Sequence, residues 1–213
     1  MSNRRLPVYL LLDTSGSMRG EPIHAVNNGL QVLISALKQD PYALESAYLS
    51  LITFDIKANE IFPLTSLDQV QLPEITTPDS GPTFLGAALK LLVERIDCDT
   101  MRITENQKKD WHPLLFIMTD GIPSDLQSYR EAIPEIKKHK FGNIVACAAG
   151  PKAKQEYLKE LTDNIVCLDT LDSSGFLQFF KFVSDIMAVG SRSADAILQH
   201  TLPSPPAEVR LTM

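Results

Sequence analysis

The chain has 213 residues, of which 44% are hydrophobic and 22% are charged, and its formal net charge is −6 at pH 7. This composition is that of a soluble globular protein with enough residues to bury one substantial core. The negative charge argues against nucleic acid as a partner, because phosphate binding needs a basic surface. No apolar run has transmembrane length, and none shows the pattern of a cleaved signal peptide. We therefore expect a cytoplasmic protein that neither binds nucleic acid nor inserts directly into a membrane.

The first half of the chain alternates buried strands with helical patterns. The apolar run 8–12 is continuous, which predicts a strand buried on both faces. Apolar residues at helical spacing predict a helix over 23–37, and a second strand follows at 47–54. The weaker segment 58–64 contains Pro63, so it is predicted to form an antiparallel edge strand.

A long segment without a regular pattern, 65–82, comes next, and a loop of this length is usually functional or disordered. A helix from about Thr83 and a buried strand at 113–120 follow. The remaining predicted elements are a helix over 128–140 that Pro134 breaks or kinks, a strand at 143–150, a short helix near 153–161, a strand at 165–171 and a last helix at 175–189.

This order of elements predicts an α/β fold with a doubly wound, mostly parallel sheet, one antiparallel edge strand and helices on both faces. The domain is expected to span residues 1–190. Beyond that point helical periodicity is lost and prolines accumulate. Residues 191–213 are therefore interpreted as a C-terminal tail that wraps the domain or stays mobile.

The cysteines and histidines give no indication of a metal site. Cys98, Cys147 and Cys167 show no CxxC spacing, and the last two lie in apolar runs, where a reduced cysteine acts as a small hydrophobic residue. The four histidines are scattered along the chain without the spacing of metal ligands.

Oxygen-bearing side chains, in contrast, gather where the two continuous apolar strands end. Asp13 and Asp120 each close such a strand, and in a doubly wound sheet ligands bind at the carboxyl ends of the strands. If these strands are neighbours, the two carboxylates repel each other unless a cation lies between them. Ser15 and Ser17 follow in the same turn as Asp13, and Thr83 begins a helix at the end of the long loop. Together these residues describe an oxygen-only site for a hard cation such as Mg²⁺.

Each of these residues also has a purely structural explanation. Serine and threonine near helix starts usually cap the helix, and an aspartate after a strand is often a turn residue. Taken alone, Thr83 or Ser17 would be interpreted in this way, and Asp125 is interpreted as a helix cap. The joint pattern on three separate connections favours the metal site.

The same motifs resemble a known family. The segment DTSGS (13–17) has the DxSxS form of the von Willebrand factor A (VWA) domain, Thr83 matches the loop threonine of that family, and TDG (119–121) matches its second aspartate motif. The resemblance covers roughly residues 6–190. It implies the doubly wound fold already predicted and a complete metal-ion-dependent adhesion site.

In the family pattern, Ser15 and Ser17 bind the metal directly, Thr83 binds directly or through water, and Asp13 and Asp120 hold coordinating waters. A first shell of mainly neutral oxygens leaves the ion with most of its charge, so it seeks an anion at its open position. The resemblance therefore implies one divalent cation, with Mg²⁺ expected first and Mn²⁺ or Ca²⁺ as alternatives. A partner protein would supply an Asp or Glu side chain to that ion.

A narrower similarity connects the chain to the bacterial TerY type, which is encoded with tellurium-resistance genes. It rests on the segments RRLPVYLLLDTSGSMRGEPI, DPYALESAYLSLITF and LLFIMTDGIPSD. This similarity implies a protein-interaction module without enzymatic activity in a tellurium-resistance or stress-response complex. The partners implied are other proteins of that gene cluster.

Three alternatives stay open from the residues alone. A Mg²⁺-dependent phosphotransferase would use Asp13 as nucleophile, although Ser15 stands where such enzymes place a second acid. A serine hydrolase would use Ser15 or Ser17, but GxSxG is absent and no motif links a histidine to either serine. A structural scaffold with an unused metal site is the third alternative.

Overall fold

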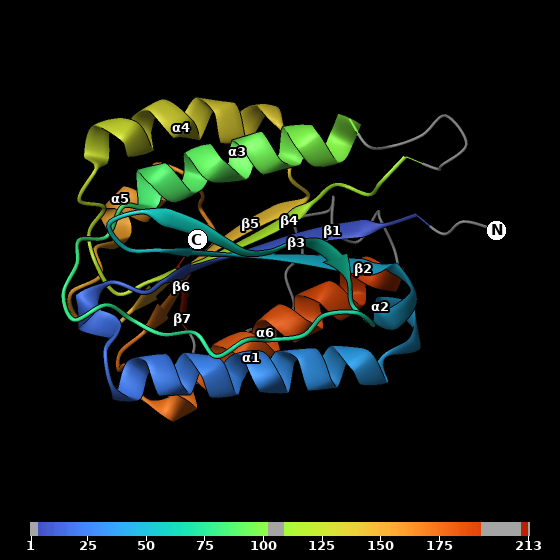
Figure 1. The fold of residues 1–213 in the computed structure, drawn as a ribbon, viewed down its shortest axis with the longest axis horizontal. Coiled ribbons are helices and arrows are strands. Elements are labelled where there is room, and N and C mark those ends of the chain that lie inside the picture. The colour runs from blue at the N-terminus through green and yellow to red at the C-terminus, as the bar shows by residue number, and fades with distance from the viewer. Residues whose placement is uncertain (1–3, 102–108, 193–209, 213) are drawn as a thin grey trace.

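Five parallel strands form the centre of a seven-stranded sheet, whose order is β3-β2-β1-β4-β5-β6-β7 (Figure 1). The computed structural model describes residues 4–101, 109–192 and 210–212. The strands are Leu6–Asp13 (β1), Ala47–Phe54 (β2), Ala58–Ser66 (β3), Leu114–Thr119 (β4), Asn143–Ala149 (β5), Ile165–Leu168 (β6) and Arg210–Thr212 (β7).

The two outermost strands run antiparallel to their neighbours. β3 pairs with β2 after a short connection, as Pro63 and the connection length predicted. At the other edge β7 pairs with β6, with Thr212 opposite Ile165. The predicted fold class is confirmed, and β7 is an additional antiparallel edge strand that comes from the segment interpreted as a tail. Residues 193–209 of that segment lie outside the described part of the chain.

Helices cover both faces of the sheet (Figure 1). α1 and α6 pack on one face together with α2, and α3 and α4 pack on the other face with α5. The helices are Glu21–Gln39 (α1), Pro41–Ser46 (α2), Leu85–Met101 (α3), Leu126–Lys138 (α4), Gln155–Lys159 (α5) and Ser173–Arg192 (α6), with a 3₁₀ turn at Gly16–Met18 (η1).

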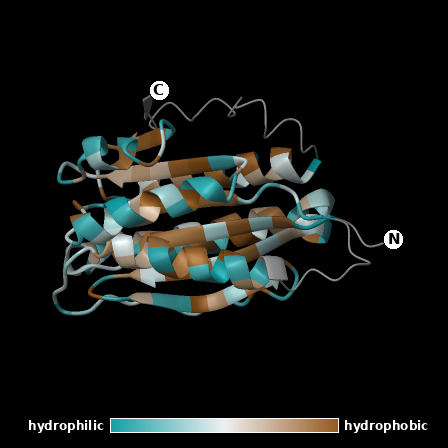
Figure 2. Ribbon diagram, turned by 90° about the horizontal axis from the view of Figure 1, so that it is seen from above, coloured by the Kyte–Doolittle hydropathy of each residue, from teal (hydrophilic) through white to brown (hydrophobic). Residues whose placement is uncertain are grey.

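The continuous apolar strands are buried on both faces, as predicted. All eight residues of β1 are buried. Their side chains alternate, so that Leu10 and Leu12 belong to the core under α1 and α6, whereas Tyr9 and Leu11 belong to the core under α3 and α4. Figure 1 shows the strands between the two layers of helices, and in Figure 2 much of the central strands is coloured as hydrophobic. β1 therefore connects the two cores and holds its carboxyl end at a fixed place.

One helix continues through a proline at which the sequence indicated a possible break. Pro134 was predicted to break or kink the helix over 128–140, but α4 runs without a break from Leu126 to Lys138 with Pro134 inside it. Pro134 lies on the exposed side of α4, while Ile133 and Ile136 on the inner side are buried. An interior proline costs about 3 kcal/mol in a helix. Packing of the amphipathic face outweighs this local cost, because tertiary contacts supply most helix stability in proteins.

The long loop after β3 is fixed to the rest of the molecule. Leu67, Val70 and Ile75 are buried in the core under α1. The Asn27 side chain on α1 accepts a hydrogen bond from the Ile75 backbone N–H and donates one to the Ile75 carbonyl, each at 2.8 Å. A single side chain thus satisfies both backbone groups of a loop residue, and the loop is held over the sheet by α1.

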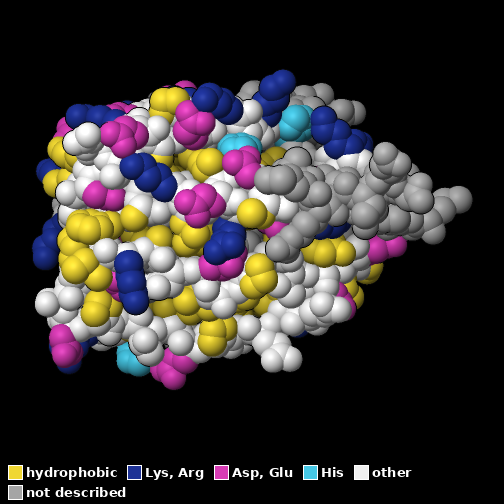
Figure 3. Space-filling view, turned by 45° about the horizontal axis from the view of Figure 1, so that its top comes forward, with side chains coloured by type: hydrophobic (Ala, Val, Ile, Leu, Met, Phe, Trp, Pro, Cys, Tyr) yellow, Lys and Arg dark blue, Asp and Glu magenta, His cyan; other side chains and the backbone are white. Residues whose placement is uncertain are grey.

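The outer surface of the molecule on the side of α3 and α4 carries basic and acidic side chains interspersed with one another (Figure 3). Some of them form ion pairs between elements, such as Lys90 with Glu131 and Arg130 with Glu160. Within the described residues, no helix combines the length and the apolar character that crossing a membrane requires.

Candidate metal centre

The two aspartates of the predicted site lie at the ends of neighbouring strands. β1 ends at Asp13, and Asp120 directly follows β4, which pairs with β1 in parallel register with Leu12 opposite Met118. Because parallel strands end at the same edge of a sheet, this pairing brings both residues to one edge, as the sequence predicted.

Asp13 is fully buried, and neutral donors hold both of its carboxylate oxygens. Oδ1 accepts a hydrogen bond from the Ser15 backbone N–H at 2.8 Å, and Oδ2 accepts one from the Thr119 hydroxyl at 2.6 Å. Burial nevertheless raises the pKa of Asp13 to about 6, and the nearby charge of Asp120 adds to the shift. The two hydrogen bonds oppose this shift without cancelling it. The site therefore contains a carboxylate for which a nearby cation would be favourable.

The two serines connect this turn to the second aspartate. Ser15 Oγ lies 3.2 Å from Ser17 Oγ, and the Ser17 hydroxyl donates a hydrogen bond to Asp120 Oδ1 at 2.9 Å. Ser15 is buried, whereas Ser17 is exposed. Burial also raises the pKa of Asp120, while the Ser17 hydrogen bond and the charge of Lys152 act in the opposite direction. The oxygens of these three residues thus form one continuous polar cluster that reaches the surface.

The loop before α3 brings Thr83 to the same edge. Thr83 is buried, and its hydroxyl lies so close to Gly121 that a Cβ added there would be 2.9 Å from Thr83 Oγ1. A Cβ at Gly16 would be only 2.8 Å from the Ser80 backbone. Glycines at positions 16 and 121 therefore allow the three segments that carry the predicted ligands to approach one another closely.

Two contacts around the site did not follow from the sequence pattern. Thr119, the last residue of β4, supports Asp13, and only its position directly before Asp120 could have indicated this role. Asp125 does cap a helix as predicted, but its carboxylate accepts hydrogen bonds from Gly86 and Ala87 in α3 and makes none to its own helix α4. This cap joins the loop after β4 to the helix that follows Thr83.

The donor set fits a hard divalent cation. All five candidate side chains offer oxygen, and two of them are carboxylates with raised pKa values. The described residues contain no group of three or more His, Cys, Asp or Glu side chains arranged to hold a metal ion. A metal at this edge would therefore depend on the hydroxyls of Ser15, Ser17 and Thr83 and on water, which is a coordination mode that Mg²⁺ accepts.

Comparison with known proteins agrees with the fold. The model of the von Willebrand factor type A domain matches residues 8–188. The chain belongs to this family, since the match covers most of its length. A comparison with curated proteins gave no match.

Several solved structures share the fold at low sequence identity. Proximal thread matrix protein 1 from the mussel byssus is 16% identical, with a TM-score of 0.66 over 86% of this chain and 48% of that chain. A second structure of that protein has a TM-score of 0.65. It is described as having a zinc-occupied MIDAS motif, which is the metal-ion-dependent adhesion site. A von Willebrand factor type A protein from Catenulispora acidiphila is 14% identical, with a TM-score of 0.66 over 87% of this chain and 43% of that chain. This chain thus spans about half the length of these relatives.

Proposed function

We propose that this protein is a metal-dependent protein-interaction module that binds an Asp or Glu side chain of a partner through one divalent cation. VWA domains are metal-dependent interaction modules, and this chain belongs to that family. Ser15 and Ser17 would bind the ion directly, Thr83 directly or through water, and Asp13 and Asp120 through coordinating waters. Mg²⁺ is the ion we expect, with Mn²⁺ or Ca²⁺ as alternatives.

The observation that carries this proposal is that the carboxylate and the hydroxyls of the polar cluster have different surroundings. The fully buried Asp13 carboxylate is occupied by two hydrogen-bond donors, whereas the hydroxyl of the exposed Ser17 connects Ser15 to Asp120. Neutral first ligands leave a bound cation with most of its charge. A cavity of about 150 Å³ between Ser17, Asp120 and Lys152 gives a carboxylate of a partner room to approach.

The same geometry argues against the enzymatic alternatives. A nucleophilic Asp13 would need a free, accessible oxygen, but both of its oxygens accept hydrogen bonds and the residue has no solvent exposure. For a serine hydrolase, Ser15 or Ser17 would need a base, and the hydrogen-bond partners of their hydroxyls are each other and Asp120. We therefore propose a binding function without catalysis.

We further propose, from the similarity to the TerY type, that the module acts in the cytoplasm within a tellurium-resistance or stress-response complex. The partners would be other proteins of that gene cluster. A scaffold with an unused metal site is the competing proposal, and the partner experiment distinguishes the two.

Affinity capture from a host that carries this gene cluster tests the function directly. Wild-type protein and Asp13→Ala are each used as bait, once with Mg²⁺ and once with a chelator. Asp185→Ala, which removes an exposed carboxylate on α6, serves as the charge-matched control. We expect a gene-cluster protein to be captured only by the wild type and the control, and only with Mg²⁺. Capture that is equal in all conditions would refute metal-dependent recognition.

A further inference from the structure

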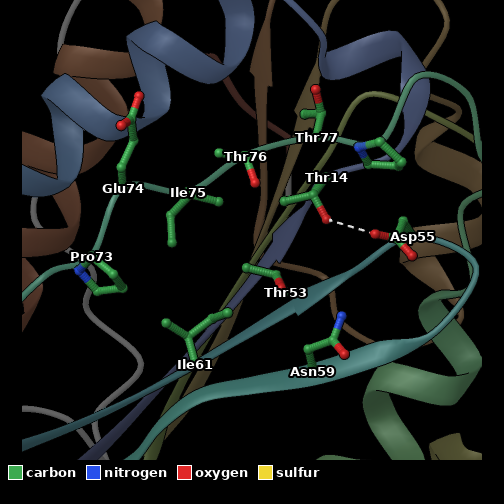
Figure 4. Close-up of a pocket in the computed structure, with 11 residues that line it drawn as sticks. Thr14, Thr53, Asp55, Asn59, Ile61, Pro73, Glu74, Ile75, Thr76 and Thr77 are labelled. Carbon is green, nitrogen blue, oxygen red and sulfur yellow. Dashed lines mark hydrogen bonds between the residues drawn. The ribbon is translucent and has the colours of Figure 1, made fainter.

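A second cavity lies beside the candidate metal centre and is separate from it. Its volume is about 430 Å³, which is within the range of small-ligand pockets. It lies between the ends of β2 and β3 on one side and the segment 73–78 of the long loop on the other (Figure 4). We call it the threonine pocket, after Thr14, Thr53 and Thr76 in its lining.

The floor of the threonine pocket is polar and built on paired strands. Thr53 on β2 and Asn59 on β3 are directly opposite each other in the antiparallel ladder, so their side chains lie on the same face of the sheet. Thr53 is only 4% exposed, and its hydroxyl forms no hydrogen bond with the described residues. The hydroxyl lines the cavity, so it can exchange hydrogen bonds there with a ligand or with water.

A carboxylate stands at the edge of this floor. Asp55 follows β2 and lies across the cavity from segment 73–78, with one oxygen 3.5 Å from the Thr14 hydroxyl (Figure 4). Its other oxygen accepts a hydrogen bond from the Lys57 backbone N–H. Among the described residues it forms no ion pair. Its negative charge is therefore available to a ligand.

The opposite wall of the pocket is held in place. Ile75 is buried, and the two hydrogen bonds from Asn27 fix its backbone to α1. In Figure 4 the Thr76 hydroxyl is directed toward the cavity, whereas the Glu74 carboxylate is directed away from it. A cavity between a strand pair and a fixed loop keeps its shape without a ligand, and binding therefore requires little ordering.

From these contacts we infer that the threonine pocket binds a guanidinium group, supplied by an arginine of the same partner whose acid reaches the metal. Guanidinium carries five N–H donors in a plane and no acceptor. The pocket offers complementary acceptors in the Asp55 carboxylate and in the Thr53 and Thr76 hydroxyls. Thr14 lines the pocket and lies between Asp13 and Ser15 in sequence. Partner residues only a few positions apart could therefore reach both sites.

This inference rests on the proposed function for the identity of the partner, but the pocket itself needs no metal. The experiment is therefore done with the full chain in chelator. The probe is Nα-acetyl-arginine methylamide, and binding is followed through the backbone amide NMR signals of Thr14, Thr53, Asp55 and Thr76. A probe of this size is expected to bind with a dissociation constant of about 1 mM. The neutral citrulline counterpart, which has the same shape without the charge, should not saturate these signals.

Three variants test which groups bind the probe. Asp55→Asn should weaken binding about tenfold, because a charge-assisted hydrogen bond is lost. Thr53→Val keeps the side-chain shape and should weaken binding about threefold. Glu74→Gln removes the same charge from a neighbouring carboxylate that is directed away from the cavity, and binding should stay within about twofold of wild type.

The possible outcomes separate the two proposals. Equal binding of the arginine and citrulline probes, equal effects of Asp55→Asn and Glu74→Gln, or no saturable shift at these amides would each overturn the guanidinium assignment. A failure of the metal to bind in calorimetry would overturn the proposed function but leave this result intact. Arginine-specific shifts that Asp55→Asn removes would support the inference.

Discussion

At the scale of single residues, Asp13 is the most informative side chain in this structure. It has no solvent exposure and forms no ion pair with the described residues, and its raised pKa reflects the cost of burying its charge. Asp120 nearby has a raised pKa as well. Burying two such carboxylates at one edge of the sheet destabilises the folded state, and a bound cation would offset this by balancing their charge.

The first prediction concerns metal binding by these carboxylates. Titration calorimetry with MgCl₂ should show one site in the wild type and none in Asp13→Ala or Asp120→Ala, because each change removes half of the negative charge that attracts the ion. Asp185→Ala should bind like the wild type. If both site variants bound Mg²⁺ normally, the ligand assignment would be wrong.

The second prediction concerns the hydroxyls. Ser15→Ala combined with Ser17→Ala should abolish metal binding, since the proposed direct ligands are lost. In chelator, the double variant should lose only about 1 kcal/mol of unfolding free energy, because it gives up the hydrogen bonds between Ser15, Ser17 and Asp120 at the rim of the sheet. Thermal melts followed by circular dichroism measure this. A variant that fails to fold would instead assign the serines a structural role.

At the scale of elements, the contact between α3 and α4 positions the loops that carry Thr83 and Asp120. A Cβ at Gly86 on α3 would lie 2.3 Å from the Tyr129 backbone nitrogen on α4, so the helices approach closely at this point. The Asp125 carboxylate accepts hydrogen bonds from two backbone N–H groups of α3 at the same place. The alignment of the two loops thus depends on this junction.

The third prediction tests that junction. Asp125→Ala should reduce the free energy of unfolding by about 1–2 kcal/mol, because two backbone donors at the start of α3 lose their acceptor. Asp185→Ala, which removes an exposed aspartate, should change it by less than about 0.5 kcal/mol. Urea denaturation of both variants provides the comparison. Equal stability of the two variants would show that the cap contributes nothing.

Elements with a strong local signal could be predicted from the sequence, and those defined by tertiary contacts could not. Continuous apolar runs indicated the buried parallel strands, and the strand ends indicated where Asp13 and Asp120 lie. The strand β7 is three residues long and exists only through pairing with β6, so it has no signal of its own. Asp125 was expected to cap a helix, but which helix it caps is decided by how α3 and α4 pack.

At the scale of the whole molecule, the candidate site is assembled from three segments far apart in the chain. The turn at 13–17, the loop at 80–83 and the turn at 119–121 come together only when β1 and β4 pair and α3 packs against the sheet. An unfolded chain does not hold these oxygens together. Metal binding should therefore be selective for the native state.

The fourth prediction follows from this selectivity. A ligand that binds only the folded chain stabilises it by about 2.7 kcal/mol at a concentration of 100 times its dissociation constant. We expect the melting temperature of the wild type to rise with Mg²⁺ concentration and that of Asp120→Ala to stay constant. Differential scanning calorimetry measures both. A melting temperature that rises equally in the variant would indicate nonspecific salt effects.

The proline in β3 has a consequence for how copies of this protein meet in concentrated solution. β3 is the last strand at its edge of the sheet, and its outer side is a potential template for aggregation between molecules. Pro63 is exposed in this strand and has no backbone N–H to donate to another strand. A proline at this position therefore disfavours β-pairing between molecules along the exposed edge of the sheet.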